Sequence, residues 1–208
     1  MKKNITLFLI IFAVVVIYYT LDYSRHHQPI PADIVNLEFP LKGGSFQAIQ
    51  SGPNGKTHTL PVEKYALDII KKIKPGDFFK FHKSNLESNA TFGTPIYSPC
   101  AGNVTIAVDG FVDMPIGIAG TSDKSNHVTV DCGQFYVAMV HFKKDSILVN
   151  VGDAVSIGQL IGLIGNSGHS SSPHLHLMAY RIGSGIDNKI ALPIAFNGKY
   201  LFRGDIYP

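Results

Sequence analysis

Two histidines in the second half of the chain, His174 and His176, have the type and spacing of residues that do chemistry. A single apolar residue separates them within the run His-Leu-His-Leu-Met-Ala-Tyr, whose composition is typical of a β-strand. Because side chains alternate between the two faces of a strand, both imidazoles are expected on one face. Such a pair, reached through the Gly/Ser/Pro-rich residues 165–173, suits a metal centre or a proton-transfer pair. The alternative is a pair of partly buried structural histidines.

Three further polar residues are candidates to join that pair. His141 ends a run of alternating residues and is therefore expected at the end of a strand. Asp68 lies inside an apolar run, where a carboxylate is costly to bury unless it is paired or binds a metal. The alternative for Asp68 is an exposed position on an amphipathic face. His58 follows a segment that is rich in turn-forming residues.

Short β-rich runs, broken by Gly, Pro, Asn and Asp, must position these residues. Closely spaced short strands with turn signals predict a single antiparallel all-β domain. One segment, residues 64–74, is ambiguous between a helical turn and a buried strand, because periodicity does not decide over so few residues. The expected strands are residues 94–97, 103–108, 127–130, 134–142, 159–164 and 174–180.

The N-terminus has a different character. Two lysines precede an apolar run over residues 5–21, which at about 17 residues is the short limit for a membrane-spanning helix. No small-x-small cleavage site follows the run, and the lysines favour a cytoplasmic N-terminus. We therefore expect an uncleaved transmembrane signal anchor over residues 1–22, a linker over 23–33 and an extracytoplasmic domain, in the periplasm or at the cell surface, over 34–208. The alternative is a cleaved signal peptide, which would give a secreted protein.

The expected export of the domain bears on the redox state of its two cysteines, Cys100 and Cys132. An oxidising compartment favours a disulfide between them. The alternative is two unpaired thiols, since the sequence does not show whether their Cα atoms lie close enough.

The net charge of +3 is small and its basic residues are scattered along the chain. A mild positive charge suits an anionic cell-wall surface. It is too small to argue for nucleic acid as a partner, and no basic patch with interleaved aromatic residues is present in the sequence.

Five segments, taken in order, carry a resemblance to a known family. Gly93–Val104 contains Gly-Thr-Pro-Ile-Tyr-Ser-Pro, and the segment Val151–Gly162 contains Gly-Asp-Ala-Val followed by Gly-Gln. The others are Asn126–Val130, Val140–Phe142 and Gly165–His176. Together they resemble the lysostaphin-type zinc metallopeptidases of the M23 family, which mostly cut peptide bonds in bacterial peptidoglycan. The similarity covers roughly residues 55 to 180.

The resemblance implies a fold and a set of site residues. The implied fold is the antiparallel β-sheet groove of the lysostaphin-type peptidases. His58, Asp68 and His176 are implied as the Zn²⁺ ligands, and His141 and His174 as the pair that handles protons. The compact form of the family places the first histidine and the aspartate four residues apart, whereas His58 and Asp68 are ten apart. This spacing resembles a branch with a Tyr-Ala-Leu-Asp strand and a more distant histidine; His82 is the other histidine nearby.

The chemistry of these residues agrees with that implication. Two imidazoles and one carboxylate leave a fourth position on zinc for water, as in catalytic sites. The sequence has no His-Glu-x-x-His, so the proton acceptor is expected to be a histidine rather than a glutamate. The implied function is a zinc-dependent metalloendopeptidase that hydrolyses peptidoglycan.

Two other classes of protein share parts of this pattern. An inactive M23-like domain that binds peptidoglycan or a cell-wall partner is the main alternative. The Gly-Asp-Ala-Val turn also resembles biotinyl and lipoyl carrier domains, but these need a lysine at the hairpin tip, and none lies between Ile161 and His174.

Overall fold

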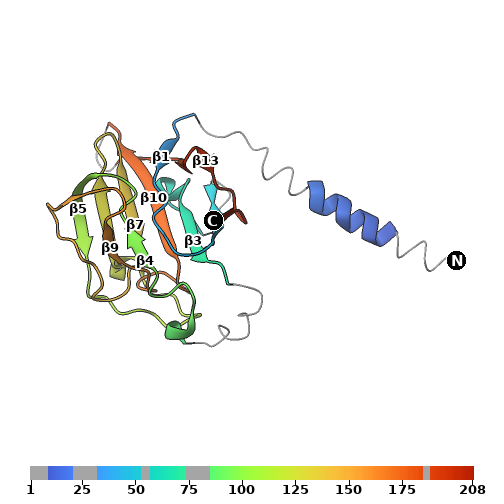
Figure 1. Cartoon of the computed structure of the whole chain (residues 1–208), viewed down its shortest axis with the longest axis horizontal. Helices are drawn as coiled ribbons and strands as arrows, with labels where there is room; N and C mark the ends of the chain where they lie inside the picture. The colour runs from blue at the N-terminus through green and yellow to red at the C-terminus, as the bar shows by residue number, and fades with distance from the viewer. Residues whose placement is uncertain (1–8, 21–31, 53–56, 74–84, 185–187) are drawn as a thin grey trace. The chain divides into compact units, whose positions relative to one another are not determined.

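The computed structural model describes residues 9–20, 32–52, 57–73, 85–184 and 188–208. The chain divides into two compact units, Met1–Ala32 and Asp33–Pro208. Figure 1 shows the second unit as a predominantly β structure. The prediction of an antiparallel all-β domain is thereby confirmed.

In the first unit, a helix covers residues 9–20. The rest of the predicted anchor, and residues 23–31 of the predicted linker, lie outside the described residues. Among the helices that the structure describes, none is both long and apolar enough to cross a membrane. The structure therefore does not support the predicted transmembrane helix.

The second unit is built on one large, antiparallel, nine-stranded sheet. Its strands are β2 (Phe46–Ser51), β3 (Leu67–Lys71), β5 (Gly102–Val108), β6 (His127–Asp131), β7 (Tyr136–Val140), β8 (Ala154–Val155), β10 (Leu175–Ile182), β11 (Lys189–Leu192) and β14 (Ile206–Tyr207). Their order is β14-β2-β3-β10-β7-β6-β5-β8, and β11 pairs with the second half of β10. β10 therefore lies in the centre, between β3 and β7 (Figure 1).

Two smaller sheets complete the unit. One contains β1 (Val35–Leu37), β12 (Ile194–Phe196) and β13 (Lys199–Tyr200), and the other pairs β4 (Pro95–Tyr97) with β9 (Leu160–Leu163). The β1–β12 pair is parallel. The connections that the structure describes include the short 3₁₀ turns η2 (Pro61–Glu63), η4 (Leu86–Ser88) and η5 (Ser122–Lys124). A single buried apolar cluster contains side chains from all three sheets.

Alternation along the central strands separates the core from the polar residues. In β10, Leu175, Leu177 and Ala179 are at most 1% exposed and belong to the core. In β3, Leu67 and Ile69 are likewise 1% exposed and belong to the core. The intervening residues of both strands must project from the opposite face of the sheet, because successive side chains alternate. The ambiguous segment 64–74 thus contains a buried strand, which presents one polar side chain on the face away from the core.

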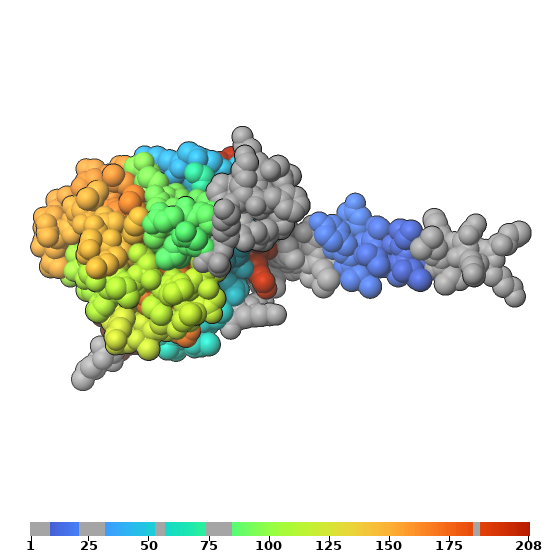
Figure 2. Space-filling view, turned by 90° about the horizontal axis from the view of Figure 1, so that it is seen from below, coloured from blue at the N-terminus to red at the C-terminus, as the bar shows by residue number. Residues whose placement is uncertain are grey.

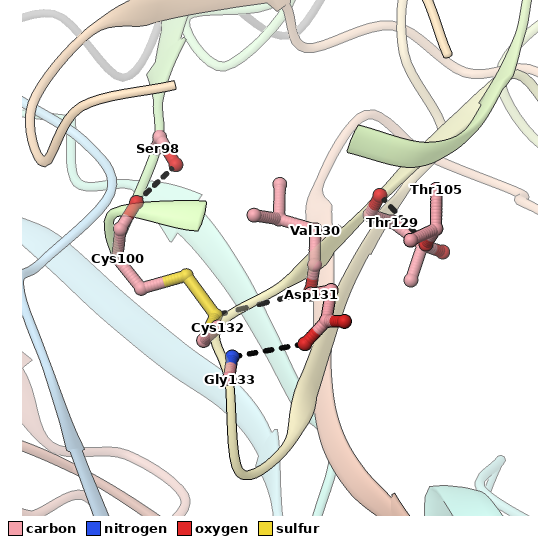
Figure 3. The surroundings of a disulfide bond; sticks show 8 residues. All are labelled: Ser98, Cys100, Thr105, Thr129, Val130, Asp131, Cys132 and Gly133. Atoms are coloured by element: carbon pink, nitrogen blue, oxygen red, sulfur yellow. Dashed lines mark hydrogen bonds between the residues drawn. A yellow bond between two sulfur atoms is a disulfide. The ribbon is translucent and has the colours of Figure 1, made fainter. Parts of the chain in front are cut away.

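A disulfide joins Cys100 to Cys132, with the two Cα atoms 6.0 Å apart. Figure 3 shows it between the segment that enters β5 and the segment that leaves β6. The Ser98 hydroxyl donates to the Cys100 carbonyl at 2.7 Å beside it. The predicted disulfide is confirmed, and it uses both cysteines of the chain.

Candidate active site

Backbone pairing places a row of mostly polar side chains, called the polar row below, across the large sheet. In the register of the strands, His127 pairs with Val140, Val140 with His176, His176 with Asp68, and Asp68 with Gln50. Directly paired residues on neighbouring strands project from the same face of a sheet. The ladder between β3 and β10 alone therefore brings Asp68 and His176 together, although 108 residues separate them.

Asp68 is the centre of the site. One of its carboxylate oxygens, Oδ1, lies 2.9 Å from His176 Nδ1, 3.1 Å from His58 Nε2 and 3.5 Å from His174 Nε2. The residue is only 6% exposed, so the alternative that it occupies an exposed amphipathic face is wrong. Three imidazole nitrogens converge on a single oxygen of a buried carboxylate.

His58 reaches Asp68 from a segment that forms neither helix nor strand. Residues 57–60 directly precede η2, and the His58 side chain is 3% exposed. Its ring lies edge-on to the ring of His176, with the centroids 5.0 Å apart. The ten-residue spacing thus brings His58 to the carboxylate, whereas His82 lies outside the described residues.

His141 and His174 form a second pair beside this group. Their ring centroids are 4.7 Å apart, and His141 is 5.9 Å from the ring of His176. His141 follows β7 directly, in a left-handed backbone conformation with φ of 69°. Such a conformation costs a residue other than glycine about 1–2 kcal/mol, so the surrounding contacts must hold it.

A backbone carbonyl fixes the tautomer of each ring in the second pair. His141 Nδ1 donates to the Ser167 carbonyl at 2.7 Å, and His174 Nδ1 donates to the Ser172 carbonyl at 2.8 Å. A neutral imidazole has one N–H, so in both rings Nε2 is the basic nitrogen. In His174 this nitrogen is the one that lies near Asp68.

Burial and neighbouring groups shift the protonation equilibria in the site. Burial raises the pKa of Asp68, but hydrogen bonds with His176 and His58 and electrostatic interactions with His174 and His176 together lower it by more, so its pKa lies well below the usual range. Burial lowers the pKa of His141 well below its usual value, and the His174 and His176 rings lower it too. Burial also lowers the pKa of His174, which Asp68 raises in part. His141 and His174 are therefore neutral at neutral pH and able to accept a proton.

The five residues form two overlapping groups that could hold a metal ion. One contains His58, Asp68 and His176, and the other contains His141, His174 and His176; within each group the candidate ligand atoms lie within 4.8 Å of one another. The structure thus brings together every residue that the sequence singled out. Sequence reasoning assigned no role to the residues that support them.

Asn126 is the clearest of these supporting residues. It is fully buried, and its side-chain amide donates to the carbonyls of Phe111 and Phe142 at 2.8 and 3.1 Å. Its side-chain oxygen accepts from the Phe111 backbone, and its own backbone N–H donates to Ser167 Oγ. Asn126 therefore links Phe142, the residue after His141, to Ser167, whose carbonyl accepts a hydrogen bond from the His141 ring. Its position directly before the expected strand 127–130 was the available sequence signal.

Hydrogen bonds join the segment between β5 and β6 to the loop before His174. Asn166 N–H donates to Asp113 Oδ1 at 2.6 Å, and Gly120 N–H donates to the Gly168 carbonyl at 2.8 Å. A Cβ on Gly168 would lie only 1.8 Å from Ser125 Oγ, so only glycine fits this contact. In the space-filling view the yellow-green segment forms a continuous part of the surface (Figure 2). The hydrogen bonds hold the segment against the loop that precedes His174.

The model of Peptidase family M23 matches residues 81–188, a little more than half of the chain. That range contains His141, His174 and His176, whereas His58 and Asp68 precede it.

Two curated proteins are similar over a comparable length. A protein of Vibrio cholerae, the peptidoglycan DD-endopeptidase ShyA, is 38% identical over 125 residues, which cover 59% of this chain and 28% of that protein. An uncharacterized metalloprotease of Buchnera aphidicola is 32% identical over 117 residues, 55% of this chain and 28% of that protein. The matched part of this chain thus spans little more than a quarter of the length of either relative.

A solved structure supports the fold. A candidate glycyl-glycine endopeptidase lytM from Ruminococcus gnavus superimposes with a TM-score of 0.50 at 19% identity, over 75% of this chain and 56% of that one. At this identity the likeness concerns the fold alone.

Proposed function

Because the chain belongs to Peptidase family M23, we propose that it is a zinc-dependent endopeptidase that hydrolyses peptide bonds in bacterial peptidoglycan. The observation that carries the proposal is the convergence of His58 Nε2 and His176 Nδ1 on Asp68 Oδ1, beside the neutral pair His141 and His174. The name of the Vibrio cholerae relative supports peptidoglycan as the substrate class.

The donor set fits a zinc ion. Imidazole nitrogens and a carboxylate oxygen are ordinary zinc ligands, and three of them leave one position open. A tetrahedron with bonds of about 2.0–2.1 Å has edges of about 3.3 Å. The separations of 3.1 and 2.9 Å between the two ring nitrogens and Asp68 Oδ1 are close to that edge. When bound there, zinc would polarise the scissile carbonyl and lower the pKa of water.

His141 and His174 supply the proton transfers. The neutral Nε2 of one ring accepts a proton from the attacking water, and the resulting imidazolium returns that proton to the leaving amine. Their lowered pKa values keep both rings in the accepting form at neutral pH. An imidazolium in this position also stabilises negative charge that develops on the substrate carbonyl oxygen.

Digestion of purified peptidoglycan by the full chain tests the proposal. Mass spectrometry of the released fragments should show cleavage within the peptides, which a chelator abolishes and added Zn²⁺ restores. Zinc bound at about one ion per chain, with no hydrolysis of any wall preparation, would instead favour an inactive binding domain. Absence of zinc binding would refute the assignment of the metal.

We also propose that the domain acts outside the cytoplasm and is held at the membrane by its N-terminal segment. The disulfide between Cys100 and Cys132 supports an oxidising compartment. Extraction of membranes at alkaline pH tests the anchor, because an anchored chain stays in the membrane fraction. Release of a soluble protein with a new N-terminus near Arg25 would refute the anchor and support a cleaved signal peptide.

A further inference from the structure

Two buried polar atoms in the described part of the chain have no hydrogen-bond partner, although one can accept a hydrogen bond and the other can donate one. Gln50 Oε1 and His58 Nδ1 are the only buried side-chain nitrogen or oxygen atoms there that lack a hydrogen-bond partner. One is an acceptor, and the other is a ring nitrogen that can carry a proton. Leaving such an atom buried and unpaired costs about 1–3 kcal/mol, so each calls for a partner.

Gln50 lies at the site because of an irregularity in β2. Ala48 pairs with Ile69, but the register then shifts, and Gln50 pairs with Asp68. Without the extra residue, Ile49 would lie opposite Asp68. The bulge thus places an amide at the end of the polar row where a regular strand would place an apolar side chain, as bulges near active sites do.

The Gln50 amide also forms a hydrogen bond with the segment that contains His58. Gln50 Nε2 donates to Thr57 Oγ1 at 3.2 Å, and Thr57 immediately precedes His58. This segment forms no strand, so backbone pairing does not set the orientation of the His58 ring. A side-chain contact must do so.

We infer that Gln50 is a positioning residue for His58, whose Nδ1–H donates to Gln50 Oε1 when Nε2 binds the metal. This inference rests on the proposed zinc site. When His58 Nε2, the nitrogen that lies 3.1 Å from Asp68 Oδ1, binds the metal through its lone pair, the proton of the neutral ring is on Nδ1. Metal-binding histidines almost always donate this second N–H to an acceptor, which fixes the ring and its tautomer.

Zinc titration of the full chain, kept in detergent, tests the inference with Zn²⁺ as the probe. Gln50→Met keeps the length of the side chain and removes the acceptor, so the dissociation constant for zinc should rise about 10–100-fold. Gln50→Glu retains an acceptor oxygen and should bind zinc at least as tightly as the parent. The matched control is Gln47→Met on the same strand, because Gln47 Nε2 donates to the Gly204 carbonyl, away from the site. Its zinc affinity should not change.

A measurement on the parent protein does not depend on the folding of any variant. Nitrogen-15 NMR of the zinc-loaded chain should show His58 as the Nδ1–H tautomer, with a proton protected from exchange. An unprotected proton, or Gln50→Met with the zinc affinity of the parent, would overturn the role of Gln50 and leave the zinc site standing. If the parent chain failed to bind zinc, the proposed function itself would be wrong.

Discussion

The site has two parts that are positioned in different ways. Asp68 and His176, the strand-borne pair, face each other on β3 and β10, and the backbone ladder between these strands sets their separation. His58, His141 and His174, the loop-borne histidines, lie outside the strands. Each of them depends on individual contacts, such as the Ser167 carbonyl that accepts from His141.

This difference predicts where the site is sensitive to substitution. The strand-borne pair belongs to a sheet whose hydrogen bonds and core side chains over-determine its geometry, so changes in neighbouring side chains should move it little. The loop-borne histidines should respond to the loss of a single supporting group, because few contacts fix each ring. Substitutions of the site residues and of the groups that support them test this difference.

The largest effect is expected from the strand-borne pair. Asp68→Ala removes the carboxylate on which three imidazoles converge, and His176→Ala removes the nitrogen 2.9 Å from it. Both variants should lose bound zinc and, with it, hydrolysis. Elemental analysis beside an assay on purified peptidoglycan measures the two losses. Retention of zinc by His176→Ala would contradict its role as a ligand.

A smaller but still large effect is expected from the second pair. His141→Ala should keep nearly one zinc per chain and lose about 10²–10⁴-fold in rate, the usual contribution of a positioned acid–base group. His174→Ala should behave similarly, with a partial loss of zinc because its Nε2 lies 3.5 Å from Asp68 Oδ1. The same two measurements apply. If His141→Ala emptied the site, the division between ligands and proton-handling residues would be wrong.

The strand-borne pair and the loop-borne histidines also differ in how well the sequence predicts their positions. Alternation in the His-Leu-His and Tyr-Ala-Leu-Asp runs predicts which side chains share a face, because strand geometry is regular. The resemblance to M23 peptidases implied the roles. The pairing of β3 with β10, by contrast, joins residues that are 108 apart, and no local pattern encodes that register.

The supports of the loop-borne histidines were harder to predict. Asn126 donates to backbone carbonyls of two other segments. Every residue has a backbone carbonyl, so the residue types in the sequence do not reveal these contacts. Gln50 faces the site only because of a bulge, which shifts the period of the strand by one residue. The predicted membrane-spanning helix rested on the apolar run and the residues that flank it, and the described helix covers only part of that run.

An intermediate effect is expected from Asn126→Ala. The change leaves the carbonyls of Phe111 and Phe142 without their buried donor, which should lower the free energy of unfolding by about 1–3 kcal/mol. Loosening of the residues after His141 should lower the hydrolysis rate about tenfold while zinc stays bound, since proton transfer depends on ring position. Denaturant unfolding and the peptidoglycan assay measure both effects. Asn103→Ala, an exposed residue of β5, is the control and should change neither.

The smallest effect on the site is expected from the disulfide. Cys132 follows β6 at the end opposite His127, which belongs to the polar row. Cys132 is five positions after His127, which is about 16 Å along a strand at 3.3 Å per residue. The double variant Cys100→Ser/Cys132→Ser should therefore lower the free energy of unfolding by about 3–4 kcal/mol, the loop-closure contribution of a bond across 32 residues. Its zinc affinity and its hydrolysis rate at temperatures where it stays folded should match those of the parent.

That expectation separates global stability from site geometry. If losing the disulfide weakened zinc binding as much as Gln50→Met, the strand-borne pair would depend on the far end of the sheet, contrary to a locally determined ladder. If stability fell while zinc affinity held, the sheet would be shown to keep Asp68 and His176 in register after losing several kcal/mol. The loop-borne histidines would then be the part of the site that individual side chains control.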